Sequence, residues 1–414
     1  MNSRHTGPQR RTLLAAAAGA VGLAPFACLR AQTAKEVKMA MVAPLSGPWA
    51  RGGQLMLAGA QMAIEDVNKA GGIKALGGAR MTLVTADAGD SVDKARSAVQ
   101  RLLSQEPDLV AGSGAWLSSF TMAVTEVTER EKLSWLTNSY ADPITSRGYR
   151  YVFQTSPKAT TFINESLPRL VEIIQAATGR KPKSAAILAD NTASSNAYAK
   201  PLAEKLLKEN GLELVQHETF TPPLSDATAM VRKMRSVAPD LLVLLTSNVP
   251  DTKVILDKMA EFKLSGKVAV WGGSGAFGSP EMAQVIRREA LDGLIFCVAN
   301  WTVKGQEELA KRFIERSKEP FMSHEPISTY GDVWTLKEAI EMAGSTDRVK
   351  VGDALHRISI QSGPAAVAYY GGVKFTESGL REGSHVLLVQ WQGGIPKVIG
   401  PAEVAIAKPT GLTR

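Results

Sequence analysis

The sequence predicts an α/β protein built from two doubly wound lobes. Short apolar segments of strand length alternate with segments of helical periodicity along most of the chain. This alternation runs through two successive series, the first ending near residue 154 and the second beginning near residue 184. A chain of 414 residues that is 44% hydrophobic can also form two cores of about 150 to 200 residues each.

The first strand, loop and helix are predicted within residues 37–72. Residues 37–42 form a short apolar run, which Pro44 and Pro48 interrupt. From Leu55 the apolar residues recur with helical spacing until the glycines at positions 71 and 72 end the helix. The free N–H groups and the positive end of this helix dipole therefore lie beside the loop, where they favour a carboxylate or another polar head group.

The remaining elements follow in order along the chain. In the first series we expect strands at 81–86, 109–111, 133–136 and 151–154 and helices at 91–103 and 119–130. In the second we expect strands at 184–188, 212–217, 241–245, 268–271 and 294–298 and helices at 197–208, 227–236, 251–261 and 280–288. A helix-rich section follows at 307–316, 328–343 and 351–357, and a late strand at 386–391. Because open α/β sheets bind ligands beyond the carboxyl ends of their strands, the loops that follow these strands are expected to carry the site.

Residues 1–31 are predicted to be a secretory signal peptide. They hold four arginines, no acidic residue and an apolar stretch at 13–27, which is short for a transmembrane helix. Arg10-Arg11 resembles a twin-arginine signal, and the sequence leaves open whether the general or the twin-arginine route is used. Cleavage after Ala31 would deliver the protein to the periplasm.

The charge and cysteine content of the remaining chain exclude several classes of protein. Removing four arginines lowers the formal charge from +8 to +4, so a nucleic-acid partner is not implied. Cys297 becomes the sole cysteine, so no internal disulfide can form. The four remaining histidines show no metal-ligand spacing, and we expect neither a metal nor a cofactor.

Three segments resemble a known family. They are PLSGPWARGGQLMLAGAQMAIEDVNKAGGI from residue 44, YGDVWTLKEAIEMAGSTD from residue 330 and VLLVQWQGGIPKVIGP from residue 386. They are similar to the branched-chain-amino-acid-type (Leu/Ile/Val-binding-protein-like) periplasmic solute-binding proteins of ABC importers. The resemblance implies a type I periplasmic binding protein fold, with two lobes joined by a three-strand hinge and a ligand cleft between them. By this analogy lobe 1 comprises 35–157 and 298–384, and lobe 2 comprises 158–297 and 385–408.

The candidate ligand-binding residues lie in or beside the loops after the predicted strands. Ser118 and Ser119 stand where a helix begins, so their hydroxyls could cap the helix, hold a ligand carboxylate, or do both. The resemblance favours the carboxylate, with Ser118 as the main candidate. Trp116 and Tyr140 could pack in the core or offer aromatic faces to an apolar ligand body. The predicted set is Ser46, Trp49, Trp116, Ser118, Ser119, Ser139, Tyr140, Ala141, Asn191, Ser195, Asn248 and Ser274.

Three of these positions depart from the pattern of relatives that bind α-amino acids. Those relatives commonly have a threonine at the loop of Ala141, a tyrosine near Asn248 and an acidic residue at Ser274, which pairs with the ammonium group. A buried ammonium without an anionic partner costs several kcal/mol. The departures therefore argue against a simple zwitterionic amino acid unless another carboxylate reaches the site. Asp190 and Asp142 are candidates for that role, or else ordinary turn residues.

The function we expect is that of a non-enzymatic receptor. It would close on a small solute and deliver it to an ABC transporter permease; the solute is a carboxylate with an apolar or aromatic body, or is amino-acid-like. The alternatives are an exported α/β enzyme acting on a small carboxylate or amide, and a ligand sensor of the same fold. The GxGxxG pattern at 273–278 lacks the acidic residue about 20 positions on that a dinucleotide site requires. We expect a monomer with no nucleic-acid partner.

Overall fold

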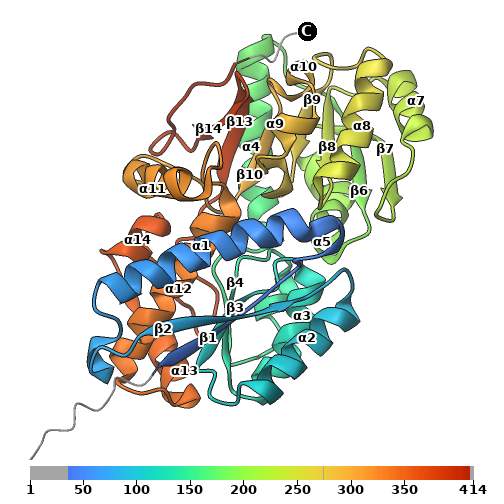
Figure 1. Cartoon of the computed structure of the whole chain (residues 1–414). Coiled ribbons are helices and arrows are strands. Elements are labelled where there is room, and N and C mark those ends of the chain that lie inside the picture. The colour runs from blue at the N-terminus through green and yellow to red at the C-terminus, as the bar shows by residue number, and fades with distance from the viewer. Residues whose placement is uncertain (1–35, 274, 411–414) are drawn as a thin grey trace, which may run out of the picture. The chain divides into compact units, whose positions relative to one another are not determined.

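The computed structural model describes residues 36–273 and 275–410. The predicted signal peptide, its cleavage site and Ser274 lie outside the described residues. The described part of the chain forms two large sheets, each covered by helices on both faces (Figure 1). None of the described helices combines the length and apolar character needed to cross a membrane.

The first sheet has five parallel strands in the order β2-β1-β3-β4-β5. Helices α1, α12 and α13 cover one face, and α2 and α3 cover the other. The strands are β1 (Val37–Ala43), β2 (Met81–Asp87), β3 (Ala111–Gly114), β4 (Ser134–Thr137) and β5 (Val152–Gln154). The helices are α1 (Ala50–Lys69), α2 (Val92–Gln105), α3 (Ser118–Arg130), α12 (His324–Ala343) and α13 (Arg348–Arg357).

The second sheet has seven strands in the order β14-β13-β10-β9-β8-β6-β7, of which β13 and β14 run antiparallel to their neighbours. Helices α4 and α5 lie on one face, and α7, α8, α9 and α10 on the other. The strands are β6 (Ser184–Asp190), β7 (Glu213–Phe220), β8 (Leu241–Leu245), β9 (Ala269–Gly272), β10 (Ile295–Val298), β13 (Leu387–Gln392) and β14 (Ile395–Gly400). The helices are α4 (Ala159–Thr178), α5 (Ala193–Pro201), α7 (Thr228–Val237), α8 (Val249–Glu261), α9 (Met282–Val285) and α10 (Arg288–Leu291).

Shorter elements complete the described chain. They include α6 (Leu207–Glu209), α11 (Glu307–Ser317), α14 (Pro364–Ala368) and the two-stranded sheet of β11 (Ser359–Ile360) and β12 (Val373–Lys374). Single turns lie at Gly47–Trp49, Lys74–Leu76, Asp142–Thr145 and Gly275–Gly278, and a π-helical turn lies at Leu202–Leu206.

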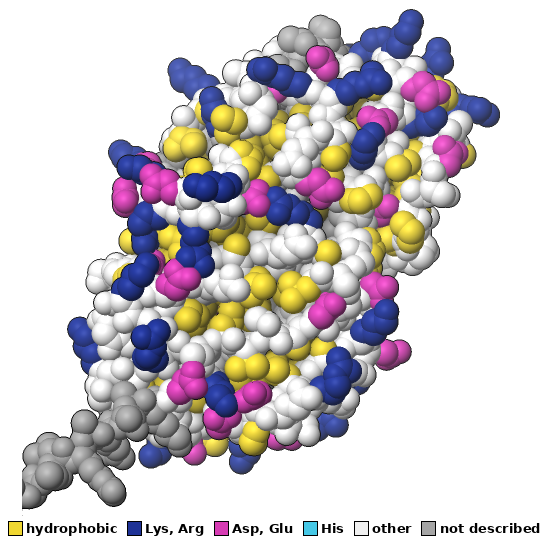
Figure 2. Space-filling view, viewed as in Figure 1, with side chains coloured by type: hydrophobic (Ala, Val, Ile, Leu, Met, Phe, Trp, Pro, Cys, Tyr) yellow, Lys and Arg dark blue, Asp and Glu magenta, His cyan; other side chains and the backbone are white. Residues whose placement is uncertain are grey.

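The chain passes between the two sheets three times. It leaves the first sheet after β5, returns to it after β10, and enters the second again before β13. After β10, helix α11 joins the first-sheet side, where Arg312 binds Asp66 of α1 at 2.8 Å and Arg316 pairs with Glu65. Figure 2 shows Lys and Arg side chains gathered over α11 with Asp and Glu side chains among them, so positive charge on this face is partly balanced locally.

The close crossing of α1 and α12 positions part of the site. A Cβ atom added to Gly59 of α1 would lie only 2.1 Å from the carbonyl oxygen of Pro326 in the first turn of α12. Only glycine allows this approach. The packing brings the start of α12 against α1, so that residues of both helices can face the same space.

The predicted alternation is confirmed, with several differences. The short elements α14, β11 and β12 were not predicted, and the helix expected at 280–288 is the two short helices α9 and α10. Helix α4 was not predicted, and it contains Pro168, which normally argues against a helix interior. Strand β14 was not predicted either; its Pro396 is tolerated because β14 lies at the edge of its sheet. Helix α12 begins at His324, four residues before the predicted start at Ser328.

Candidate functional site

Two small adjoining hollows lie between the loops of the two sheets. The first hollow, of about 20 Å³, is lined on the first-sheet side by Trp49, Arg51, Gly52, Trp116 and Glu325 and on the second-sheet side mainly by Ser247, Asn248 and Ser279. The second hollow, of about 40 Å³, is lined by Trp116, Leu117, Ser118, Tyr140, Thr192, Ser194 and Ser247. We call the two together the cleft. Because ligand pockets usually enclose about 300 Å³ or more, a ligand of amino-acid size requires the surrounding loops to separate.

Trp116 lines both hollows. It follows β3 in a loop where Ala115 and Trp116 both have positive φ, 68° and 40°, a conformation that is strained for residues other than glycine. Its carbonyl accepts a hydrogen bond from the Ser139 hydroxyl at 2.6 Å. Its ring lies against Gly52, where an added Cβ would come within 2.7 Å of the indole. The glycine therefore provides the space that the Trp116 ring occupies.

Ser118 is the first residue of α3, and its side chain is buried beside the second hollow. The N-cap position belongs to Leu117, so the helix-capping role considered for Ser118 and Ser119 is wrong. The Ser118 hydroxyl instead accepts a hydrogen bond from the Ala141 N–H at 3.2 Å. This contact holds the loop after β4 against the start of α3, and it leaves the Ser118 proton available to an acceptor in the cleft.

Tyr140 connects the two halves of the molecule. Its ring packs on Phe162 and Tyr198 of the second-sheet core, with ring centroids 5.1 and 6.1 Å away. Its hydroxyl lies 3.0 Å from Nε2 of His324 at the start of α12. Burial raises the pKa of Tyr140 and lowers that of His324 to about 4. Both groups are therefore neutral at pH 7, and the buried hydrogen bond between them carries no net charge.

The polar groups of the second-sheet wall are held by one another. Asp190, at the end of β6, is fully buried and accepts hydrogen bonds from the Thr192 N–H, the Thr192 hydroxyl and the Ser247 N–H at 3.1, 2.7 and 2.6 Å. Asn248 caps α8 by accepting from the Asp251 N–H at 2.8 Å. The Ser195 hydroxyl donates to the Leu245 carbonyl at 3.2 Å. This wall is a preassembled frame of backbone and side-chain bonds.

The two spare carboxylates considered from the sequence do not line the cleft. Asp190 is occupied as described above, and Asp142 accepts bonds from the N–H and the hydroxyl of Thr160 at 3.1 and 2.5 Å. Both behave as residues that fix local turns.

The structure brings five of the predicted site residues to the cleft and places six others elsewhere. Trp49, Trp116, Ser118, Tyr140 and Asn248 line the hollows. Ser119 is half-buried on α3, Ser139 lies beneath Trp116, Ala141 holds Ser118, and Ser195 is bonded to β8. Ser46 is exposed in a separate surface hollow with Asp87 and Lys94, and Asn191 is exposed and donates to the Thr221 hydroxyl. Ser274 lies outside the described residues.

Glu325 is the cleft residue that sequence reasoning missed most clearly. It is only 1% exposed, and its Oε2 accepts a hydrogen bond from the Ser323 hydroxyl at 2.8 Å. Its Oε1 has no hydrogen-bond partner among the described residues. Burial raises the pKa of this carboxyl to about 7. No motif marks it in the sequence, since it falls just before the predicted start of α12 and acidic residues are common.

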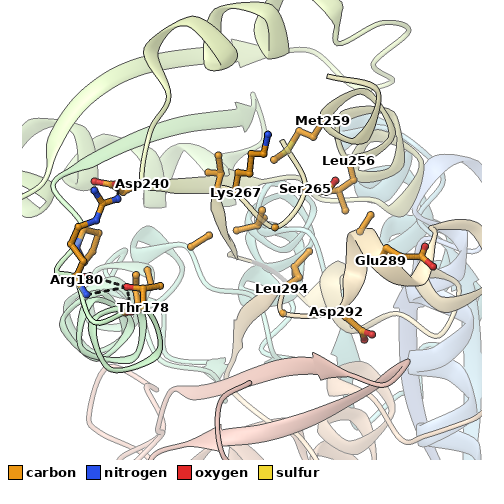
Figure 3. A pocket seen from close by; sticks show the side chains of 18 residues that line it. Thr178, Arg180, Asp240, Leu256, Met259, Ser265, Lys267, Glu289, Asp292 and Leu294 are labelled. Atoms are coloured by element: carbon orange, nitrogen blue, oxygen red, sulfur yellow. Dashed lines mark hydrogen bonds and ion pairs between the residues drawn. The ribbon is translucent and has the colours of Figure 1, made fainter. Parts of the chain in front are cut away.

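A larger hollow, of about 60 Å³, lies at the opposite end of the second sheet (Figure 3). Its walls include Asp240, Lys267 and Leu294, which stand just before β8, β9 and β10, so the hollow opens at the amino ends of the parallel strands. Arg180 on its rim donates to Asp240 at 3.0 Å. Ligands of open α/β sheets bind at the other end of the strands, so this hollow is a less suitable site than the cleft despite its size.

The described residues contain no cluster of side chains suited to hold a metal ion. Cys297 is fully buried in β10, where burial raises its pKa to about 12 and keeps it as an unreactive thiol.

Comparisons with known proteins agree on one family. A family model described as "Periplasmic binding protein" matches residues 36–394. Among curated proteins, the chain is 27% identical over 401 residues to a "Leu/Ile/Val-binding protein homolog 7" of Brucella melitensis, covering 94% of this chain and 97% of the relative.

Solved structures of other solute-binding proteins share the fold of this chain. The leucine-binding protein LivK of Thermotoga maritima aligns with a TM-score of 0.75 at 20% identity, covering 88% of this chain and 98% of that one. A solute-binding protein of an R. palustris ABC transporter in complex with benzoate aligns with a TM-score of 0.73 at 19% identity, covering 91% and 99%.

Proposed function

This chain belongs to the periplasmic binding protein family, and from that premise we propose that it is the substrate-binding protein of an ABC importer. The observation that carries the proposal is the cleft itself. Its walls come from loops at the carboxyl ends of strands in both sheets, which is where a small ligand would touch both halves at once.

Closure of two lobes around the ligand would be the mechanism. We assign lobe 1 to 35–157 and 298–384 and lobe 2 to 158–297 and 385–408, with the three chain crossings acting as the hinge. A ligand that touches both walls has a higher affinity for the closed form, so binding shifts the open–closed equilibrium toward closure. The closed form would then be recognised by the membrane permease.

The ligand we propose is a small carboxylate with an apolar or aromatic body, amino-acid-like compounds included. The Ser118 hydroxyl and the N–H groups at the start of α3 would hold the carboxylate. The faces of Trp49, Trp116 and Tyr140 would contact the body of the ligand. Leucine and benzoate, the ligands named for two similar structures, both combine a carboxylate with an apolar body.

The protein would work in the periplasm as a monomer, without enzymatic activity, with the permease as its partner and no role in nucleic-acid binding. Family membership supports the location and the association with a transporter. Absence of turnover is part of the proposal and is tested with it.

A thermal-shift panel tests this function. The exported and purified protein, after partial unfolding and refolding to remove carried ligand, is heated with amino acids, aromatic acids, short dicarboxylates, amides and urea. A true ligand at 100 times its dissociation constant stabilises the folded state by about 2.7 kcal/mol, so one class should raise the melting temperature clearly while remaining chemically intact. Lack of any shift, or consumption of a panel member, would refute the receptor assignment.

A further inference from the structure

Glu325 occupies a position from which it can touch a ligand. It is the second residue of α12, next to Pro326, where α12 crosses α1 closely at Gly59. Its side chain lines the first hollow together with Trp49 and Trp116. It therefore places a carboxyl group on the first-sheet wall of the cleft, in the hollow that the two tryptophans also line.

One of the two oxygens of this carboxyl has no hydrogen-bond partner in the described chain. Ser323 bonds to Oε2, while Oε1 is buried and has no partner within the described chain. Arg51 lines the same hollow but is committed elsewhere, since its guanidinium binds both carboxylate oxygens of Glu319 at 2.6 and 2.7 Å. A buried carboxylate without an ionic partner is unfavourable by several kcal/mol, so the position calls for a cation or a strong donor.

The location of Glu325 in the first turn of a helix explains only part of this arrangement. An acidic residue there interacts favourably with the helix dipole, and it gains about 0.3 to 1 kcal/mol when exposed. That gain is smaller than the cost of burying the carboxylate, and it does not explain why Oε1 is buried without a partner in a residue that lines a hollow. A ligand group that enters the first hollow would compensate for the burial.

We propose that Glu325 receives the protonated amino group of the ligand. This inference rests on the proposed function and narrows its ligand to an amino acid or another amine-bearing carboxylate. The carboxylate of the ligand would occupy the second hollow at Ser118, and its ammonium group would occupy the first, whose lining includes the aromatic rings of Trp49 and Trp116, and these would favour a cation. The ammonium is thereby held by helix α12 and not by the loop at position 274, where amino-acid-binding relatives are expected to carry an acidic residue.

The test compares ligands that differ only in the amino group. Binding of leucine against 4-methylpentanoate, and of phenylalanine against 3-phenylpropanoate, is measured by calorimetry at one pH and ionic strength. The protein should bind the amine-bearing member of a pair at least about tenfold more tightly. The Glu325→Gln variant keeps the size of the side chain and should lose this preference while still binding the deaminated acid.

Matched variants separate the possible failures. Glu338→Gln changes a half-buried carboxyl on the same helix that lines neither hollow, and it should keep the preference for the amine. If Glu325→Gln does not fold, Glu325→Asp supplies the test, because the shortened carboxylate should weaken binding of leucine more than of 4-methylpentanoate. Tighter binding of the deaminated acids by the unmodified protein, or an amine preference that survives in Glu325→Gln, would overturn the assignment of Glu325 but leave the receptor function intact. Failure of every member of both pairs and of the wider panel would instead count against the receptor function itself.

Discussion

The two sides of the cleft differ in whether their buried polar groups have hydrogen-bond partners within the protein. On the second-sheet side Asn248 lines the cleft and Asp190 and Ser195 lie behind it, and all three bond to neighbouring backbone or side chains. On the first-sheet wall the Oε1 atom of Glu325 and the Nε1 atom of Trp49 are buried and have no partner among the described residues. A group that is satisfied in the protein can shape a ligand site, whereas a group that is not gains a partner only when something binds.

This difference assigns separate tasks to the two walls. The second-sheet wall behaves as a rigid frame, and changes there should reduce stability first. The first-sheet wall carries the buried polar atoms that have no hydrogen-bond partner, and changes there should alter affinity and ligand preference first.

The frame is tested most severely by Asp190→Ala. This change leaves the part-buried N–H groups of Thr192 and Ser247 without their acceptor, takes one partner from the Thr192 hydroxyl, and should lower the free energy of unfolding by about 3 to 5 kcal/mol. Urea unfolding followed by circular dichroism measures the loss. Asp142→Ala is the control, because its carboxylate lies at an exposed turn and its removal should cost about 1 kcal/mol. A stable Asp190→Ala protein that has lost ligand binding would reverse the roles of the walls.

On the first-sheet wall, the pH dependence of stability tests whether the Glu325 carboxyl is buried without an ionic partner. Burial raises the pKa of Glu325 from its ordinary 4.5 to about 7, so the folded state holds the proton more tightly than the unfolded chain. The free energy of unfolding of the unmodified protein should therefore fall relative to Glu325→Gln as the pH rises from about 4.5 to about 7, by up to about 3 kcal/mol. Urea unfolding at several pH values measures this difference.

The groups that face Glu325 are shared by both proteins in this comparison. They are Arg51 of α1, which favours the charged carboxylate, Ser323, which donates to it, and Glu281, which lines the same hollow; His324 precedes Glu325 in the chain. His324, whose pKa is lowered to about 4, has the opposite effect, since its stabilisation is lost as the pH falls from about 6.5 to about 4. Because it is present in both proteins, its contribution cancels. A difference that does not change with pH would show that Glu325 titrates normally and is not buried without a partner.

The same contrast explains how much of the molecule was predictable. The alternation of β and α and the loops at the strand ends follow from local periodicity, and nearly every predicted strand has a counterpart in the structure. Trp116 and Ser118 were identified because they follow β3 directly along the chain. Their neighbourhood is encoded in consecutive residues.

Glu325 could not be found in this way. Its place in the cleft depends on the packing of α12 on α1, two helices separated by more than 250 residues, and on the absence of a Cβ at Gly59. Whether a carboxylate has a partner is likewise a property of three-dimensional packing. This is why Asp190 and Asp142 were considered from the sequence and Glu325 was not.

Trp116→Ala tests whether the first-sheet wall determines affinity. Removing the ring takes away the surface shared by the two hollows and should weaken binding of the best panel ligand at least about tenfold. The free energy of unfolding should change by about 1 kcal/mol or less, because the side chain is only half-buried. Calorimetry and urea unfolding measure the two quantities. Tyr370→Ala, at an exposed aromatic residue away from the cleft, should leave affinity unchanged. A large loss of stability with unaltered affinity would make Trp116 a packing residue.

The smallest change, Trp49→Phe, separates affinity from stability at a single atom. It removes Nε1–H, which is buried without a partner, and keeps an aromatic ring near Phe120, whose centroid lies 5.8 Å away. The unliganded protein should lose none of its stability, since an unsatisfied donor disappears, while affinity for a ligand that brings an acceptor atom into the first hollow should fall about fivefold, the value of one hydrogen bond of about 1 kcal/mol. A substitution that preserves or raises the stability of the unliganded protein but lowers its affinity is expected only where the lost polar group bonds to the ligand and to nothing else. Unchanged affinity would show that Trp49 Nε1–H does not bind the ligand, and it would leave Glu325 as the unpartnered group of this wall that does.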